Sequence, residues 1–157
     1  MTTRPLFAVL VLAGLTAFAP APLPRSPRGH RGDGLSLGEL QGTWTVTKLQ
    51  MTRGKGQLTD GGTSLAQVRI SGDRWSFVYG QARMNDVNYT IRVDHSLRPP
   101  RLDFHYLGSK DKEPYGKGIL RRDGDTVQLM YTWGGDRAAS FDTAPDGHWL
   151  ITLRRAR

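Results

Sequence analysis

Apolar residues recur at every second position through most of the chain beyond residue 42, and this alternation limits its fold more than any other feature. A period of two puts alternate side chains on opposite faces of a strand, whereas an amphipathic helix needs a period of about 3.6. The pattern appears in eight segments: Trp44–Val46, Ala66–Ile70, Trp75–Tyr79, Val87–Val93, Leu102–Tyr106, Tyr115–Leu120, Val127–Tyr131 and Trp149–Leu153. The sequence therefore predicts an all-β domain of about eight strands without a long helix.

The connections between these segments alternate in length. Long connections span residues 51–64, 80–86, 107–114 and 133–147, and shorter ones lie between them. Successive connections of an up-and-down meander fall at opposite ends, so the long ones would share one end. We expect an antiparallel up-and-down barrel with a looped mouth and a tightly closed floor, although a flattened sandwich fits the same pattern. The glycine-rich residues 51–64 would lie over the mouth as a lid.

A short helical turn is expected directly before the first strand. Ser36 and Glu39 have the S-x-x-E spacing of a capping box, in which each side chain accepts a hydrogen bond from a free backbone N–H. Gly38 disfavours a longer helix, because glycine is a poor helix former.

The N-terminal region predicts export. Residues 1–22 contain an apolar run that follows Arg4 and is too short to span a membrane, as in a signal peptide. Pro20 directly follows Ala17-Phe18-Ala19 and disfavours cleavage there, so this segment is either a signal peptide or a retained N-terminal anchor. Residues 23–35 are rich in proline, glycine and arginine and predict a disordered basic linker before a barrel domain of residues 36–157. We expect a periplasmic or extracellular protein that meets the membrane only through an uncleaved signal.

The positive charge of the chain lies partly outside the predicted barrel. The sequence has a formal net charge of +8, and four of its 22 basic residues precede Asp33, which leaves 18 against 14 acidic residues. The signs are interspersed along the strands rather than gathered in one basic stripe. This distribution argues against a nucleic-acid partner.

No set of catalytic or metal-binding residues emerges from the sequence. The four histidines, His30, His95, His105 and His148, lack the spacing of metal ligands, and the absence of cysteine removes thiolate sites. His105 would form a surface pair with Asp103, two residues away on the polar face of its strand. We therefore expect no enzymatic activity, no metal and no cofactor.

A family resemblance rests on three stretches of the chain. Leu40-Gln41-Gly42-Thr43-Trp44 opens the first strand, Asp123-Gly124-Asp125 forms a late turn, and Trp149–Arg155 ends in basic residues. Together they resemble a lipocalin-like domain family of unknown function that is common in planctomycete bacteria. The resemblance covers about residues 37–157 and implies an exported lipocalin-like barrel, without bringing an activity.

The same opening is similar to that of the wider lipocalin and calycin group. In that group a G-x-W tryptophan closes the barrel floor, and a late-strand arginine packs over it. The resemblance implies that Gly42 and Trp44 close the floor here, under Arg154 or Arg155. Alternation turns only one of these arginines inward, and we assign Arg154.

Aromatic residues on the apolar strand faces are the candidate ligand-binding residues. They are Trp75, Phe77, Tyr79, Tyr89, Phe104, Tyr106 and Tyr131. In a barrel they would point inward, either filling the interior or lining a cavity for an apolar ligand. The leading hypothesis is a non-enzymatic binding module for a small apolar or amphipathic ligand. The alternative is a cell-envelope structural or protein-interaction domain with a filled core and a protein partner.

Overall fold

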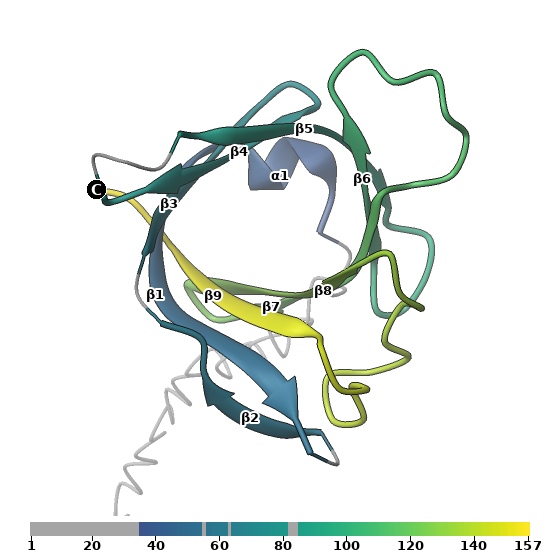
Figure 1. The fold of residues 1–157 in the computed structure, drawn as a ribbon. Helices are drawn as coiled ribbons and strands as arrows, with labels where there is room; N and C mark the ends of the chain where they lie inside the picture. Colours follow the sequence, from purple (N-terminus) through teal and green to yellow (C-terminus); the bar gives the residue numbers. More distant parts are fainter. Residues whose placement is uncertain (1–34, 55, 63, 82–84) are drawn as a thin grey trace, which may run out of the picture.

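The computed structural model describes residues 35–157 except 55, 63 and 82–84. In this part of the chain, one short helix precedes nine strands that form a single closed sheet (Figure 1). The predicted signal and most of the predicted linker lie outside the described residues. The last residue that we assigned to the linker, Leu35, is 2% exposed and belongs to the core, so the folded domain includes it.

The sheet is an antiparallel meander in which neighbours in sequence are neighbours in space. The elements are α1 (Leu37–Leu40), β1 (Gly42–Arg53), β2 (Gln57–Asp60), β3 (Leu65–Ser71), β4 (Arg74–Tyr79), β5 (Val87–Asp94), β6 (Arg101–Tyr106), β7 (Gly116–Asp123), β8 (Thr126–Trp133) and β9 (Trp149–Arg155). Pairing of β1 with β9 closes a ring of eight strands, and β2 lies outside this ring, paired only with the end of β1. The predicted eight-stranded up-and-down barrel is confirmed, with β2 as an additional strand.

The expected lid over the mouth is wrong in its local structure. Residues 51–64 do not form one long loop, because β1 continues to Arg53 and pairs there with β2 as a hairpin. A β-bulge between Val46 and Lys48 shifts the alternation of β1, so that Leu49 packs inward after Val46. A simple period of two therefore stops matching the sequence halfway along the strand.

The short helix α1 closes the floor of the barrel. Ser36 and Glu39 form the predicted capping box, in which the Ser36 N–H donates to Glu39 Oε2 over 3.0 Å. Leu40 at the end of α1 is fully buried, and the adjoining Gln41 side chain bonds to backbone atoms of Gly72 in the β3–β4 turn. The helix is thus held against the end of the barrel at which the short turns lie.

The last long connection packs against the outside of the barrel rather than over its mouth. We call residues 134–148 the strap. Its Ala138, Ala144 and Phe141 form a second apolar cluster with the outward-facing Ile119, Met130 and Leu150 of β7, β8 and β9. Arg137 of the strap donates to the carbonyl oxygens of Leu102 and Gly118 and pairs with the Asp103 carboxylate. This side of the sheet is therefore covered on both faces.

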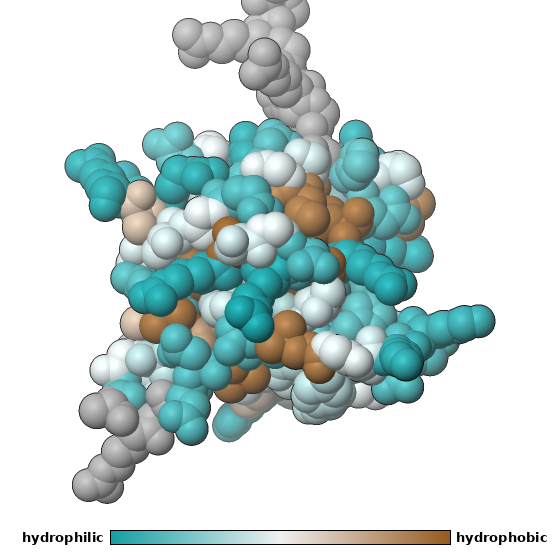
Figure 2. Space-filling view, turned by 90° about the horizontal axis from the view of Figure 1, so that it is seen from above, coloured by the Kyte–Doolittle hydropathy of each residue, from teal (hydrophilic) through white to brown (hydrophobic). Residues whose placement is uncertain are grey.

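The surface shown in Figure 2 is mostly hydrophilic, with hydrophobic side chains in separate patches between the charged ones. None of the described helices is long and apolar enough to cross a membrane.

Candidate functional site: the aromatic rim of the barrel

Four aromatic rings gather at the mouth end of the barrel, and we call them the rim cluster: Tyr89, Tyr106, Tyr115 and Trp133. The centroids of Tyr106 and Tyr115 are 4.3 Å apart, those of Tyr115 and Trp133 are 5.2 Å apart, and those of Tyr89 and Trp133 are 5.0 Å apart. Tyr106 is 51% and Tyr115 39% exposed, whereas Tyr89 is buried. The rings of the cluster therefore form a continuous row from the buried core to the solvent-exposed surface.

The strand register explains why these residues meet. Tyr89 of β5 lies directly opposite Tyr106 of β6, and Trp133 at the end of β8 lies opposite Gly116 at the start of β7. A Cβ atom on Gly116 would collide with the ring of Trp133, so only glycine lets that ring lie across β7. Gly116 interrupts the apolar alternation of β7, and it is thus the residue that makes room for the rim cluster.

Burial and neighbouring hydroxyls raise the pKa values of two tyrosines at this end, Tyr89 and Tyr106. Burial, followed by the charges of Tyr115, Tyr106 and Tyr79, raises the pKa of Tyr89 to about 12. The pKa of Tyr106 is raised first by a hydrogen bond with the Tyr115 side chain and then by desolvation. Neutral phenols present apolar rings together with O–H groups that can donate and accept hydrogen bonds. The rim cluster therefore suits an amphipathic ligand with a planar part.

The predicted interior residues lie on the inward faces of the strands, and the deeper ones pack against one another. The ring centroid of Trp75 is 5.8 Å from that of Phe77 and 5.5 Å from that of Phe104, and Phe77 stacks on Tyr131 at 5.9 Å. Trp75, Phe77 and Phe104 are at most 2% exposed. These rings form a solid aromatic layer below the rim, so a ligand that met the rim cluster would lie at the mouth end.

The remaining predicted site residues divide between the interior and the rim. Tyr79 is half-buried against the core, and burial raises the pKa of its hydroxyl. Tyr106 does not have the buried interior position that we expected, because it is the last residue of β6 and half of its surface is exposed.

Sequence reasoning missed two members of the rim cluster, Tyr115 and Trp133. Trp133 continues the inward alternation of Val127, Leu129 and Tyr131, but we assigned it to the following loop. Tyr115 precedes β7, and its N–H donates to the Phe104 carbonyl over 2.8 Å, which extends the β6–β7 pairing by one residue. Alternation continued to the end of β8 would have placed Trp133 on the inward face. Tyr115 directly precedes Gly116, which lies opposite Trp133, so alternation gives no signal that the Tyr115 ring joins the cluster.

The floor end carries the predicted closure, with one correction. Trp44 is buried, and its indole N–H donates to the Leu40 carbonyl over 2.7 Å. The arginine over its ring is Arg155, with Cζ 4.6 Å from the ring centroid, and the assignment to Arg154 is wrong. Gly42 has φ +113°, and a Cβ there would lie 3.1 Å from Arg155 Nη1. Glycine thus permits both the backbone conformation and the approach of the guanidinium.

A side groove of about 500 Å³ opens where β1 changes partner from β3 to β2. Val46, Leu49 and Leu65 at its base also belong to or pack on the main core. The groove is a second place at which the apolar interior approaches the surface.

Two of the histidines within the described residues, His105 and His148, are buried. The expected surface pair of His105 with Asp103 is wrong, because His105 is 6% exposed and the Asp103 carboxylate pairs with Arg137. His148 is buried, with its ring nitrogens 3.0 Å from the Pro145 carbonyl oxygen and 2.9 Å from that of Asp136. In the described part of the chain, no three histidine, aspartate or glutamate side chains are grouped to hold a metal ion.

Comparisons with known proteins add no relative: no family model, no curated protein and no solved structure matches this chain.

Proposed function

We propose that this protein is a non-enzymatic binding module that holds a small amphipathic ligand at the rim cluster. The supporting observation is the stack formed by Tyr89, Trp133, Tyr115 and Tyr106, which runs from a buried ring to two exposed ones. Exposed aromatic rings in contact with each other offer a flat surface for a planar apolar group, and the hydroxyls offer hydrogen bonds. The ligand stacks on the exposed rings and stays above the aromatic layer of Trp75, Phe77 and Phe104.

The proposal includes the export that residues 1–22 predict and membership of the lipocalin-like family that the opening motif resembles. The closed eight-stranded antiparallel barrel is compatible with a lipocalin-like domain, and the proposed export rests on the sequence of residues 1–22 alone. The protein would therefore bind its ligand in the periplasm or outside the cell.

Native mass spectrometry of protein purified from its natural source is the first experiment. A reproducible extra mass that disappears on denaturation is expected, and its value gives the ligand class. A bare mass combined with failure of the dye experiment below would overturn the proposal.

The second experiment measures binding of anilinonaphthalene sulfonate, a planar amphipathic dye, by its fluorescence. Tyr115→Ala should weaken dye binding about tenfold, because it removes one stacking ring and a partner of the three other rings of the rim cluster. Leu58→Ala is the matched control, since Leu58 is 43% exposed but lies on β2 outside the closed ring. Equal loss in both variants would mean that the dye binds exposed apolar surface in general.

A second candidate function has its own observation. The direct contacts among Trp75, Phe77 and Phe104 give the filled core that an envelope interaction domain would have. In that case Tyr106, Tyr115 and the neighbouring Leu107, which is 46% exposed, would contact a protein partner instead of a small ligand. Cross-linking from Tyr115 in the source organism to one recurrent protein, without a bound small molecule, would favour this second function.

A further inference from the structure

A groove of about 440 Å³ lies at the floor end of the barrel, opposite the rim cluster, and we call it the floor groove. Arginines from two strand ends and the C-terminal segment line it: Arg122, Arg154, Arg155 and Arg157. Asp125 is the only acidic residue of the described chain that lines it, which leaves an excess of three positive side-chain charges. We propose that the floor groove is a binding site for a phosphate group.

Two of these arginines are already oriented by the fold. Arg155 donates from Nη1 to the Gln41 carbonyl and from Nη2 to the Glu39 carbonyl, both over 3.0 Å, while its guanidinium stacks on Trp44. These contacts use two of the five N–H groups of the guanidinium and leave others for a ligand. A guanidinium held in place loses little conformational freedom when an anion binds, so Arg155 provides a pre-organised side of the site.

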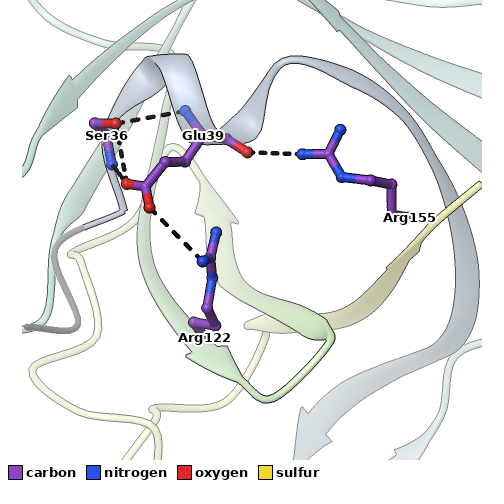
Figure 3. A network of polar contacts seen from close by, with 4 residues as sticks. All are labelled: Ser36, Glu39, Arg122 and Arg155. Carbon is purple, nitrogen blue, oxygen red and sulfur yellow. Dashed lines mark hydrogen bonds and ion pairs between the residues drawn. The ribbon is translucent and has the colours of Figure 1, made fainter. Parts of the chain in front are cut away.

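The side chain of Arg122, near the end of β7, lines the same floor groove as Arg155. Figure 3 shows Arg122 and Arg155 on two sides of Glu39, whose Oε1 lies 3.6 Å from Arg122 Nη1. The Glu39 carboxylate also accepts the capping-box bonds from Ser36. Including Glu39 in the balance still leaves an excess of two positive side-chain charges around the groove.

Arg154 and Arg157 supply the charge that is not neutralised. Neither has an ion pair among the residues that the structure describes, and both are exposed. Like charges gathered in one groove repel each other and raise the local potential, which a bound anion would lower. Arginine is suited to this anion because its planar fork matches the oxygens of a phosphate in two parallel hydrogen bonds.

The phosphate could come from a soluble compound or from the headgroup of an anionic lipid. The chain enters the barrel at the floor, since Leu35 packs in the core beside α1. The residues before it include the apolar run 6–19 and three arginines, Arg25, Arg28 and Arg31. If residues 1–22 stay in a membrane, the floor end is the end joined to it by the linker.

The first arm of the test measures thermal unfolding of the full chain with inorganic phosphate against chloride at equal ionic strength. We expect the midpoint to rise by about 3–5 °C at ten times the dissociation constant of phosphate. The double variant Arg154→Ala/Arg157→Ala should lose this rise. The charge-matched control Arg69→Ala/Arg92→Ala should keep it, because these two arginines are exposed on β3 and β5 away from the groove.

The second arm measures co-sedimentation of the full chain with vesicles of phosphatidylglycerol or of phosphatidylcholine. All variants share the same N-terminal segment, so a difference between the two double variants reports the floor groove alone. Weaker binding of Arg154→Ala/Arg157→Ala to phosphatidylglycerol, relative to the control, would identify a lipid headgroup as the phosphate source. A phosphate-dependent rise in the first arm without this difference would support a soluble phosphate compound. Equal behaviour of both double variants in both arms would overturn the proposal.

Discussion

The guanidinium of Arg155 lies 4.6 Å from the ring centroid of Trp44 and bonds to the carbonyl oxygens of Gln41 and Glu39. One side chain thereby joins the end of β9 to the segment that links α1 with β1. The carbonyls at the end of α1 have few partners within so short a helix, and Arg155 supplies donors to them. This contact holds the floor of the barrel closed.

Arg155→Ala is expected to lower the free energy of unfolding by about 1–3 kcal/mol, because it removes two hydrogen bonds and the contact with Trp44. Arg154→Ala is the matched control, with an expected change of at most about 0.5 kcal/mol, since Arg154 is exposed and has no ion pair among the described residues. Urea unfolding of both variants measures the difference. Equal effects would show that Arg155 acts only through its charge.

The two most buried tryptophans should respond differently to the same substitution. Trp44 Nε1 donates to Leu40, whereas Trp75 Nε1 is buried and has no partner among the described residues. Trp44→Phe therefore removes a hydrogen bond, while Trp75→Phe removes a donor that carries a burial cost. We expect Trp44→Phe to be the more destabilising by about 1–3 kcal/mol in urea unfolding. A larger loss for Trp75→Phe would mean that its N–H has a partner in solution, such as a bound water.

The sequence predicted the barrel because the alternation was strong in most strands and the turns were short on one side. It failed where a residue disturbs the alternation. The bulge between Val46 and Lys48 hid the second half of β1 and, with it, the β1–β2 hairpin. The position of Arg155 was within reach, because alternation from the buried Leu153 turns Arg154 outward and Arg155 inward.

The position of the strap and of the rim cluster depends on contacts between distant residues. Ile119, Met130 and Leu150 are apolar at outward positions, which could have indicated that something covers them. Which loop covers them is decided by Arg137 and its carbonyl partners on β6 and β7, a match that no local pattern reveals. Likewise, the room that Gly116 leaves for Trp133 follows from the register of β7 and β8.

High pH should destabilise the protein through its tyrosines. The pKa of Tyr89 is about 12 in the folded chain because of burial and then the neighbouring tyrosines, against about 10 in the unfolded chain. Unfolded chains therefore lose this proton first as the pH rises. The stability that neutral Tyr89 contributes is complete below a pH of about 10 and falls as the pH rises from about 10 to 12.

Urea unfolding at several pH values measures this loss, and tyrosinate absorbance in the ultraviolet measures the titration itself. Tyr89→Phe should reduce the slope of stability against pH over that range by up to about 1.4 kcal/mol per pH unit, the value for one proton. An unchanged slope in this variant would show that the other tyrosines with raised pKa values, such as Tyr131, dominate the alkaline loss.

Removal of Arg137 should loosen the strap while leaving the rim cluster in place. Its guanidinium donates to the Leu102 and Gly118 carbonyl oxygens and pairs with Asp103, and both partners of this ion pair are largely shielded from solvent. Arg137→Ala leaves the carboxylate and the carbonyls without these donors, so we expect a loss of about 2–4 kcal/mol in the free energy of unfolding. Arg137→Lys should recover only part of it, because an ammonium group cannot reproduce the planar fork.

Chymotrypsin cleavage after Phe141 reports the strap directly, because Phe141 packs on the outer cluster in the closed position. Cleavage of Arg137→Ala under native conditions should be faster than in the parent protein and faster than in Arg69→Ala, an exposed arginine on β3. Binding of anilinonaphthalene sulfonate at the rim should remain, since the strap packs on the outer face of β7–β9 and the rim rings lie at the mouth. Faster cleavage together with lost dye binding would instead mean that the strap and the rim cluster open as one unit.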